Sequence, residues 1–67
     1  MAKIQLNGKK ITLKNKTSVY FLLKKYNVDY SKVAIELNGM IIPKVKFKKI
    51  ILKSKDKLEV VQFIGGG

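Results

Sequence analysis

The sequence predicts an α+β domain in which one main helix packs across a small mixed sheet. Short segments that alternate apolar and polar residues recur along the chain, as in half-buried strands. Two Asn-Gly pairs, Asn7-Gly8 and Asn38-Gly39, separate such segments in the way that hairpin turns do. The segment over residues 19–26 instead repeats apolar residues at the three- and four-residue spacing of a helix.

The first predicted element is a hairpin over residues 2–13. Asn7-Gly8 tolerates the positive φ angles of a type I′ turn, and a two-residue turn pairs Ile4 with Ile11 and Ala2 with Leu13. These four apolar side chains then share one face, so the turn geometry and the burial pattern agree. The side chains on the other face are Lys3, Gln5, Lys10 and Thr12.

A short helix is predicted next. Thr17 or Ser18 can cap its N-terminus by accepting a hydrogen bond from a free backbone N–H. Asn27 marks its end, because asparagine tolerates the left-handed conformation that stops a helix. One apolar stripe faces the hairpin and consists of Val19, Leu22, Leu23 and Tyr26.

Two strands are predicted on either side of the second Asn-Gly turn. Residues 33–37 alternate and place Val33, Ile35 and Leu37 on one face. Residues 40–42 form a short strand that Pro43 ends. Proline cannot donate a hydrogen bond to a sheet, so this strand is short or lies at an edge.

The last third of the chain leads to a final strand. Residues 44–49 are mostly lysine and are predicted to be irregular or one helical turn. Residues 50–52 return the chain to the core, and residues 54–56 form a turn. Residues 58–64 are the last strand, and apolar residues on both of its faces are typical of a central strand.

The order of the predicted elements is that of a β-grasp fold: strand, strand, helix, strand, short strand, strand. We expect the strand after the helix to lie beside the first hairpin. Residues 1–64 form the β-grasp domain, and residues 65–67 form a flexible C-terminal glycine tail.

The composition argues against an enzyme. The 67 residues include no histidine and no cysteine, which excludes imidazole and thiolate catalysis. The four acidic residues are scattered, so we expect no metal site and no bound cofactor. We find no secretory signal and no apolar run of membrane-spanning length, and we expect a cytoplasmic protein that is a monomer when free.

The charge is strongly basic, with fifteen lysines, four acidic residues and a net charge of +11. Such a charge favours a polyanionic partner, which makes a small RNA-binding module one alternative. Two features argue against it: there is no arginine, the preferred residue for gripping phosphate, and the lysines are spread along the chain. We therefore do not expect nucleic-acid binding, and acidic protein partners stay open.

The end of the chain is the feature that the fold leaves unexplained, because Gly65, Gly66 and Gly67 follow an apolar strand without a polar linker. Glycines lack a Cβ, so this segment can pass through a channel too narrow for side chains. We hypothesise that the α-carboxylate of Gly67 is the reactive group. The alternative is a frayed terminus.

Three segments together resemble the ThiS family of sulfur carrier proteins, which are ubiquitin-like β-grasp proteins. The segments are residues 4–8, residues 33–44 with the pattern LNG-x-IIP, and residues 56–67 with the glycine tail. The chain departs from the family pattern at Lys55, where the family commonly has glycine before Asp56.

The resemblance implies a reaction sequence at Gly67. An E1-like, ThiF-like partner would adenylate its carboxylate with ATP, and sulfur from a cysteine desulfurase would displace AMP to leave a thiocarboxylate. A ThiG-like thiazole synthase would accept that sulfur in thiamine biosynthesis. Apolar docking by Val61, Phe63 and Ile64 is expected, because an exposed apolar patch often marks a partner site.

Two related functions use the same fold and tail. A MoaD-like carrier would supply sulfur for molybdopterin synthesis, and a ubiquitin-like modifier would form isopeptide bonds. The LNG-x-IIP segment and the short length favour ThiS.

Overall fold

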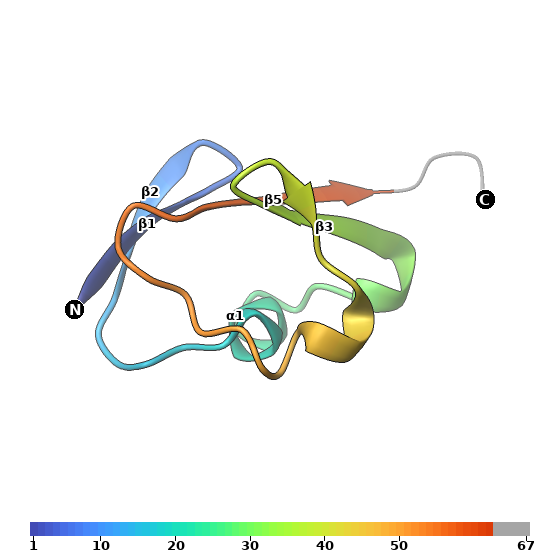
Figure 1. Cartoon of the computed structure of the whole chain (residues 1–67), viewed down its shortest axis with the longest axis horizontal. Helices are drawn as coiled ribbons and strands as arrows, with labels where there is room; N and C mark the ends of the chain where they lie inside the picture. The colour runs from blue at the N-terminus through green and yellow to red at the C-terminus, as the bar shows by residue number, and fades with distance from the viewer. Residues whose placement is uncertain (63–67) are drawn as a thin grey trace.

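The computed structural model describes residues 1–62 and shows a five-stranded mixed sheet with an α-helix packed across one face (Figure 1). This confirms the predicted fold class. The strands are β1 (Ala2–Leu6), β2 (Lys9–Leu13), β3 (Val33–Leu37), β4 (Met40–Ile41) and β5 (Lys57–Gln62), and the helix is α1 (Val19–Lys25).

The predicted hairpin is confirmed in its register as well as its position. Ile4 pairs with Ile11 and Ala2 with Leu13. Asn7 has a φ of 50° and Gly8 a φ of 80°, the left-handed values that a type I′ turn requires.

Helix α1 begins where the sequence predicts and ends one residue earlier than the apolar stripe. The Ser18 side chain accepts a hydrogen bond from the Phe21 N–H at 3.0 Å. Val19, Leu22 and Leu23 are buried, but Tyr26 is 43 % exposed. Its assignment to the buried stripe was wrong, because the helix ends at Lys25 and Asn27 turns the chain away with a φ of 56°.

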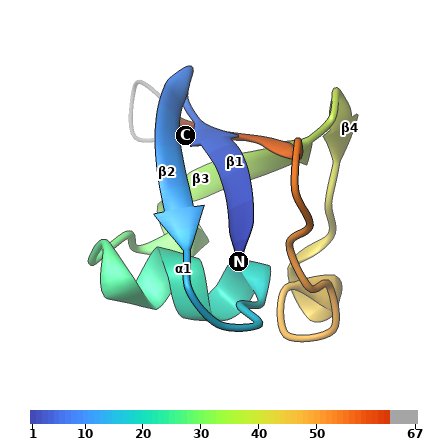
Figure 2. The same ribbon diagram turned by 90° about the vertical axis from the view of Figure 1, so that its left-hand side faces the viewer.

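The strand order corrects one prediction. The strand that follows the helix, β3, does not lie beside the hairpin, because β5 lies between them. Strand β5 pairs in parallel with β1 on one side and antiparallel with β3 on the other. This central place agrees with the apolar residues on both faces of β5. Strand β4 lies at the edge, as Pro43 predicts (Figure 2).

The segment between β4 and β5 closes the core on the helix side of the sheet. Its 3₁₀ turn, Lys44–Lys46, precedes Phe47, which is buried and packs edge-on against Tyr30 with ring centroids 5.8 Å apart. The sequence analysis missed Phe47 because lysines surround it. The predicted return of residues 50–52 to the core holds for Leu52 but is wrong for Ile51, which is 41 % exposed.

The exposure of Ile51 follows from its backbone. The Val19 N–H donates to the Ile50 carbonyl at 3.0 Å, and the Leu52 N–H donates to the Thr17 carbonyl at 2.8 Å. Residues 50–52 are therefore extended beside the start of α1, and successive side chains of an extended segment point to opposite sides. Leu52 points into the core, so Ile51 points out of it.

Candidate functional site

Strand β5 leads directly to the residues that the sequence analysis expects to be functional. Gln5 and Leu6 of β1 pair with its first two residues, Lys57 and Leu58, and β3 pairs with residues 58–62 up to Val33↔Gln62. In Figure 1, β5 runs along the sheet and ends on the side of the molecule away from the N-terminus. Strand β5 therefore has a strand on both sides at its start and is paired with β3 alone over its last residues.

The inward face of β5 is anchored in the core. Leu58 is fully buried, and Val60 is half-buried against the same cluster. Burying a leucine side chain contributes roughly 1.5–3 kcal/mol. This packing fixes which face of β5 is turned outward.

An asparagine in the first hairpin turn holds β5 from the β1 side. The Val60 N–H donates to Asn7 Oδ1 at 2.7 Å, and the Asn7 N–H donates to the Leu58 carbonyl at 2.9 Å. The side chain of Asn7 therefore continues the hydrogen bonding of the sheet beyond the last residue of β1.

An asparagine in the second hairpin turn holds the start of β5 in the same way. The Lys57 N–H donates to Asn38 Oδ1 at 2.9 Å, and Asn38 Nδ2 donates to Asp56 Oδ1 at 3.1 Å. Asn38 has a φ of 53°, so both turns use asparagine in the left-handed region and direct its side chain to β5. Both turns follow from the Asn-Gly pairs, but the hydrogen bonds of their asparagines to β5 depend on strand pairing that the local pattern does not show.

The turn before β5 explains the position where the chain departs from the family pattern. Lys55 has a φ of 76°, a conformation that favours glycine. Asp56 stabilises the turn, because its Oδ2 accepts a hydrogen bond from the Lys53 N–H at 2.7 Å. The backbone thus keeps a glycine-type turn although a lysine occupies it.

The predicted site residues are only partly within the described region. Val61 lies on the outward face of β5, 47 % exposed, and pairs with the half-buried Ala34 of β3. Phe63, Ile64, Gly65, Gly66 and Gly67 lie outside the described residues. The structure therefore describes the strand that precedes the predicted tail in the sequence and one residue of the expected docking patch.

We searched residues 1–62 for groups that could bind a metal ion, for membrane-spanning helices and for side chains with a shifted pKa. Within residues 1–62 there is no group of three or more acidic side chains that could hold a metal ion. No helix in this part of the chain is long and apolar enough to cross a membrane. Hydrogen bonds from the Ser31 hydroxyl and N–H lower the pKa of Asp29, and this carboxylate lies at the surface, remote from β5 in sequence.

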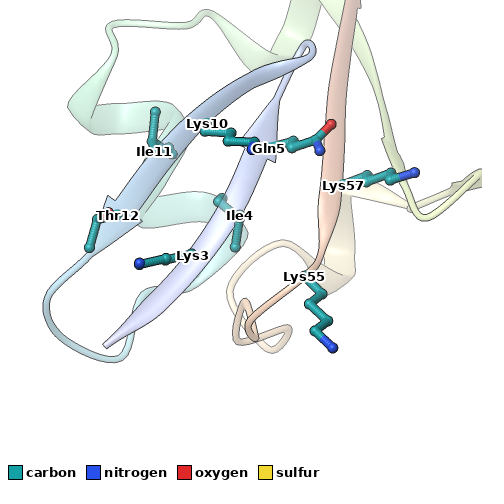
Figure 3. Close-up of a pocket in the computed structure, with 8 residues that line it drawn as sticks. All are labelled: Lys3, Ile4, Gln5, Lys10, Ile11, Thr12, Lys55 and Lys57. Atoms are coloured by element: carbon teal, nitrogen blue, oxygen red, sulfur yellow. The ribbon is translucent and has the colours of Figure 1, made fainter.

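A groove of about 430 Å³ lies along the hairpin and the start of β5 (Figure 3). The sequence analysis did not predict it, because Lys55 and Lys57 reach it only through the parallel pairing of β1 with β5. The side chains of Lys3, Lys55 and Lys57 extend in different directions, so they do not converge on one small anion. Its lining residues are Lys3, Ile4, Gln5, Lys10, Ile11, Thr12, Lys55 and Lys57.

Comparison with known proteins connects this geometry to a family. Residues 4–67 match the family model described as "ThiS family". The chain is 37 % identical over 65 residues to "Sulfur carrier protein ThiS" of Bacillus subtilis (strain 168), which covers 96 % of this chain and 98 % of that protein.

Two further relatives contain a similar domain, one as nearly its whole chain and the other as a fifth of a longer protein. The crystal structure of the thiamine biosynthesis protein ThiS from Geobacter metallireducens superposes with a TM-score of 0.84 at 31 % identity, covering 97 % of this chain and 99 % of that one. A "Thiazole synthase" of Paramagnetospirillum magneticum (strain ATCC 700264 / AMB-1) is 40 % identical over 65 residues, which are 97 % of this chain and 20 % of that protein.

Proposed function

This chain belongs to the ThiS family, and we propose that it is a sulfur carrier whose Gly67 carboxylate becomes a thiocarboxylate for thiazole formation in thiamine biosynthesis. One observation carries the proposal: the family match extends from β1 through Gly67, so it includes both the sheet and the three glycines that follow β5 in the sequence. The domain would present the tail, and the tail would carry the sulfur.

The chemistry requires activation of a carboxylate. A carboxylate is a poor acyl donor until one of its oxygens becomes part of a good leaving group. An E1-like adenylating enzyme would bind ATP, join its AMP moiety to the Gly67 carboxylate and release pyrophosphate. The terminal sulfur of a persulfide formed by a cysteine desulfurase would then displace AMP, which gives an acyl disulfide, and a thiol reductant would cleave its S–S bond to leave the Gly67 thiocarboxylate. No side-chain nucleophile of this chain is needed, in keeping with the absence of histidine and cysteine from the sequence.

The folded domain would hold β5 in place before the tail and would not itself catalyse the reaction. The hydrogen bonds of Asn7 and Asn38 hold β5, and Leu58 anchors its inward face. Gly65 and Gly66 would enter a narrow channel of the partner, because they have no side chains. We propose that Val61, with Phe63 and Ile64, contacts the partner beside that channel.

Similarity to two thiazole synthases supports a thiazole synthase as a partner of this chain. In the Paramagnetospirillum protein, a segment similar to nearly all of this chain lies in the same polypeptide as a thiazole synthase. A second such protein, from Magnetococcus marinus (strain ATCC BAA-1437 / JCM 17883 / MC-1), is 35 % identical over 65 residues. We propose that this chain delivers sulfur to a separate thiazole synthase.

Intact mass spectrometry after co-expression with the adenylating enzyme and cysteine desulfurase of the same organism tests the proposal. We expect the mass to rise by the replacement of one oxygen with sulfur, and the change to localise to Gly67. A chain lacking Gly66 and Gly67 is the control and should stay unmodified. Purified thiazole synthase should then consume the thiocarboxylate.

Other outcomes of the same experiment identify the alternatives. Covalent attachment of Gly67 to lysines of other proteins would indicate a ubiquitin-like modifier. Consumption of the thiocarboxylate by molybdopterin synthase, but not by thiazole synthase, would indicate a MoaD-like carrier. Salt-sensitive RNA binding that survives deletion of Gly66 and Gly67 would indicate an RNA-binding module.

A further inference from the structure

The turn between β3 and β4 brings a chemically labile residue pair to the start of β5. In Figures 1 and 2 the tip of this hairpin lies beside the first part of β5. At the tip Asn38 is followed by Gly39, and both residues are exposed. A Cβ added at Gly39 would meet no atom within 4 Å, so the peptide bond between the two residues is open to solvent.

An asparagine that precedes glycine loses its side-chain amide without an enzyme, because no side chain shields the next backbone nitrogen. The Gly39 nitrogen attacks Cγ of Asn38 and loses its proton as the new C–N bond forms. The bond from Cγ to Nδ2 breaks, and Nδ2 takes up a proton and leaves as ammonia. Water then opens the cyclic imide at either of its carbonyl groups. The products are aspartate and isoaspartate, and in isoaspartate the main chain passes through Cγ.

Both polar atoms of the Asn38 side chain are hydrogen bonded to the segment that opens β5. Asn38 Oδ1 accepts the Lys57 N–H at 2.9 Å, and Asn38 Nδ2 donates to Asp56 Oδ1 at 3.1 Å. The other oxygen of that carboxylate, Oδ2, accepts the Lys53 N–H at 2.7 Å. An amide therefore faces a carboxylate here, and the same carboxylate stabilises the turn before β5.

The aspartate product reverses the sign of this contact. A carboxylate at position 38 still accepts the Lys57 N–H, but at neutral pH it has no proton to donate to Asp56. Two carboxylates then face each other where a hydrogen bond was, and like charges this close repel. The only ion pair among residues 1–62 joins Lys32 and Asp29, so no lysine in that range lies close enough to Asp56 to neutralise it.

The isoaspartate product disturbs the turn as well. Asn38 and Gly39 have φ values of 53° and 85°, the left-handed values of a two-residue hairpin turn. Leu37 and Met40 pair directly on either side of it. One more main-chain carbon at this point lengthens a turn whose length sets the register of β3 with β4.

We propose that Asn38 is a site of spontaneous deamidation, and that the reaction releases the start of β5 from the second hairpin turn. The first hairpin turn has a different environment. Asn7 Nδ2 donates to the Val60 carbonyl at 3.4 Å, and Asn7 Oδ1 accepts the Val60 N–H at 2.7 Å. An aspartate at position 7 therefore loses one long hydrogen bond and faces a neutral carbonyl, whereas an aspartate at position 38 faces a carboxylate.

The variant Asn38→Asp reproduces the aspartate product directly. Its melting temperature at neutral pH should be lower by about 4–8 °C, as expected for the loss of one intramolecular hydrogen bond in a domain of this size. The matched control is Asn7→Asp, which makes the same change in the other Asn-Gly turn. Its melting temperature should fall by less, because no second carboxylate faces position 7.

A second substitution identifies the contact that is responsible. In the double variant Asn38→Asp with Asp56→Asn, the amide and the carboxylate have exchanged places. The new amide nitrogen donates to position 38, and the new amide oxygen still accepts the Lys53 N–H. The double variant should therefore recover most of the melting temperature that Asn38→Asp loses, which a change at an unrelated contact would not do.

The pH dependence provides a further readout. Repulsion within the carboxyl pair raises its folded pKa, so the stability that Asn38→Asp loses at neutral pH should return as the pH falls toward about 4. A protonated carboxyl of the pair then donates to the other. The other charged side chains near this contact occur in both chains: Lys57 and Glu59 line the hollow at Asn38, and Lys49 and Lys53 line a hollow with Asp56.

Ageing the full chain in mildly alkaline water enriched in heavy oxygen tests the reaction itself. Peptide mapping by mass spectrometry should show aspartate and isoaspartate at position 38, with one heavy oxygen in each. The reaction should be slower in the folded chain than in urea by roughly tenfold or more, because the amide must first leave two hydrogen bonds. Equal rates would contradict the hydrogen bonds to β5.

The remaining outcomes are equally decisive. The inference is wrong if Asn38 stays unmodified in the folded chain, if Asn38→Asp melts with the unchanged chain, or if the double variant melts no higher than Asn38→Asp. A loss of stability in Asn38→Asp that stays the same at acidic pH would also contradict it, since carboxylate repulsion would not be the cause. None of these measurements involves a partner enzyme or Gly67, so they leave the proposed function to its own test.

Discussion

Replacing Asn7 tests whether its side chain holds the strand that leads to the tail. The side chain accepts the Val60 N–H at 2.7 Å, and its backbone has a φ of 50°. Three substitutions separate these two properties. Asn7→Gly removes the hydrogen bond and suits the backbone, Asn7→Ala removes the bond and strains the backbone, and Asn7→Asp keeps an acceptor in the same place.

The expected magnitudes follow from these two terms. Loss of the hydrogen bond should cost about 1 kcal/mol in Asn7→Gly, because an intramolecular hydrogen bond contributes roughly 0.5–1.5 kcal/mol. Asn7→Ala should cost about 2–3 kcal/mol, since a left-handed residue with a Cβ adds roughly 1–2 kcal/mol. Asn7→Asp should cost less than Asn7→Gly, because it keeps the acceptor for the Val60 N–H and loses only the longer hydrogen bond from Asn7 Nδ2 to the Val60 carbonyl, at 3.4 Å.

Urea denaturation measures these free energies, and amide hydrogen exchange at Val60 reports on the bond itself. For a domain of this size, 1 kcal/mol corresponds to a melting-temperature shift of roughly 4–8 °C. Exchange at Val60 should accelerate in Asn7→Gly and stay slow in Asn7→Asp. If Asn7→Gly is as stable as the unchanged chain and its Val60 amide stays equally protected, then the side chain does not hold β5.

Three further predictions concern other parts of the domain. Leu58→Ala should destabilise the fold by about 2–5 kcal/mol, because it leaves a cavity under β5, and a loss below 1 kcal/mol in urea denaturation would contradict the burial of this side chain. Lys55→Gly should raise the free energy of unfolding by about 0.5–1 kcal/mol, since φ is 76° there, and a decrease would show that the lysine makes a stabilising contact. The Asp29 carboxyl should titrate below its ordinary pKa of 3.8 in an NMR pH series, and Ser31→Ala should raise that pKa. Because the folded pKa is the lower one, the stabilisation by Asp29 is complete above the ordinary value and is lost as the pH falls through the folded value, whereas an unshifted titration would refute the hydrogen bonds to Ser31.

The predictable parts of the fold are those that local rules determine. The hairpin register follows from Asn7-Gly8 and the alternation around it, and the start of α1 follows from Ser18. The helix stripe was extended one residue too far, because spacing alone does not show that the chain turns away after Lys25. Phe47 was missed, since its burial depends on Tyr30, which is distant in sequence.

The candidate site likewise has features that the local sequence pattern predicts and features that depend on pairing between strands distant in sequence. The exposure of Val61 could be predicted from sequence, because it depends on residue type and on the alternation of side chains along a strand, whereas the glycine tail lies outside the described residues and its role stays a prediction. The pairing of β3 with β5 could not be predicted, since the local pattern does not show that β5 lies between β3 and the hairpin. The roles of Asn7 and Asn38 were hidden for a similar reason: each contacts a strand that comes much later in the chain.

The parallel pairing of the first and last strands has a consequence for biosynthesis. Leu6 pairs with Leu58, so β1 and β5 can pair only after residue 58 has left the ribosome. Contacts this remote in sequence raise the contact order and slow folding, because a long loop must close before they form. A copy that has not completed folding therefore lacks the pairing that holds the start of β5 beside β1.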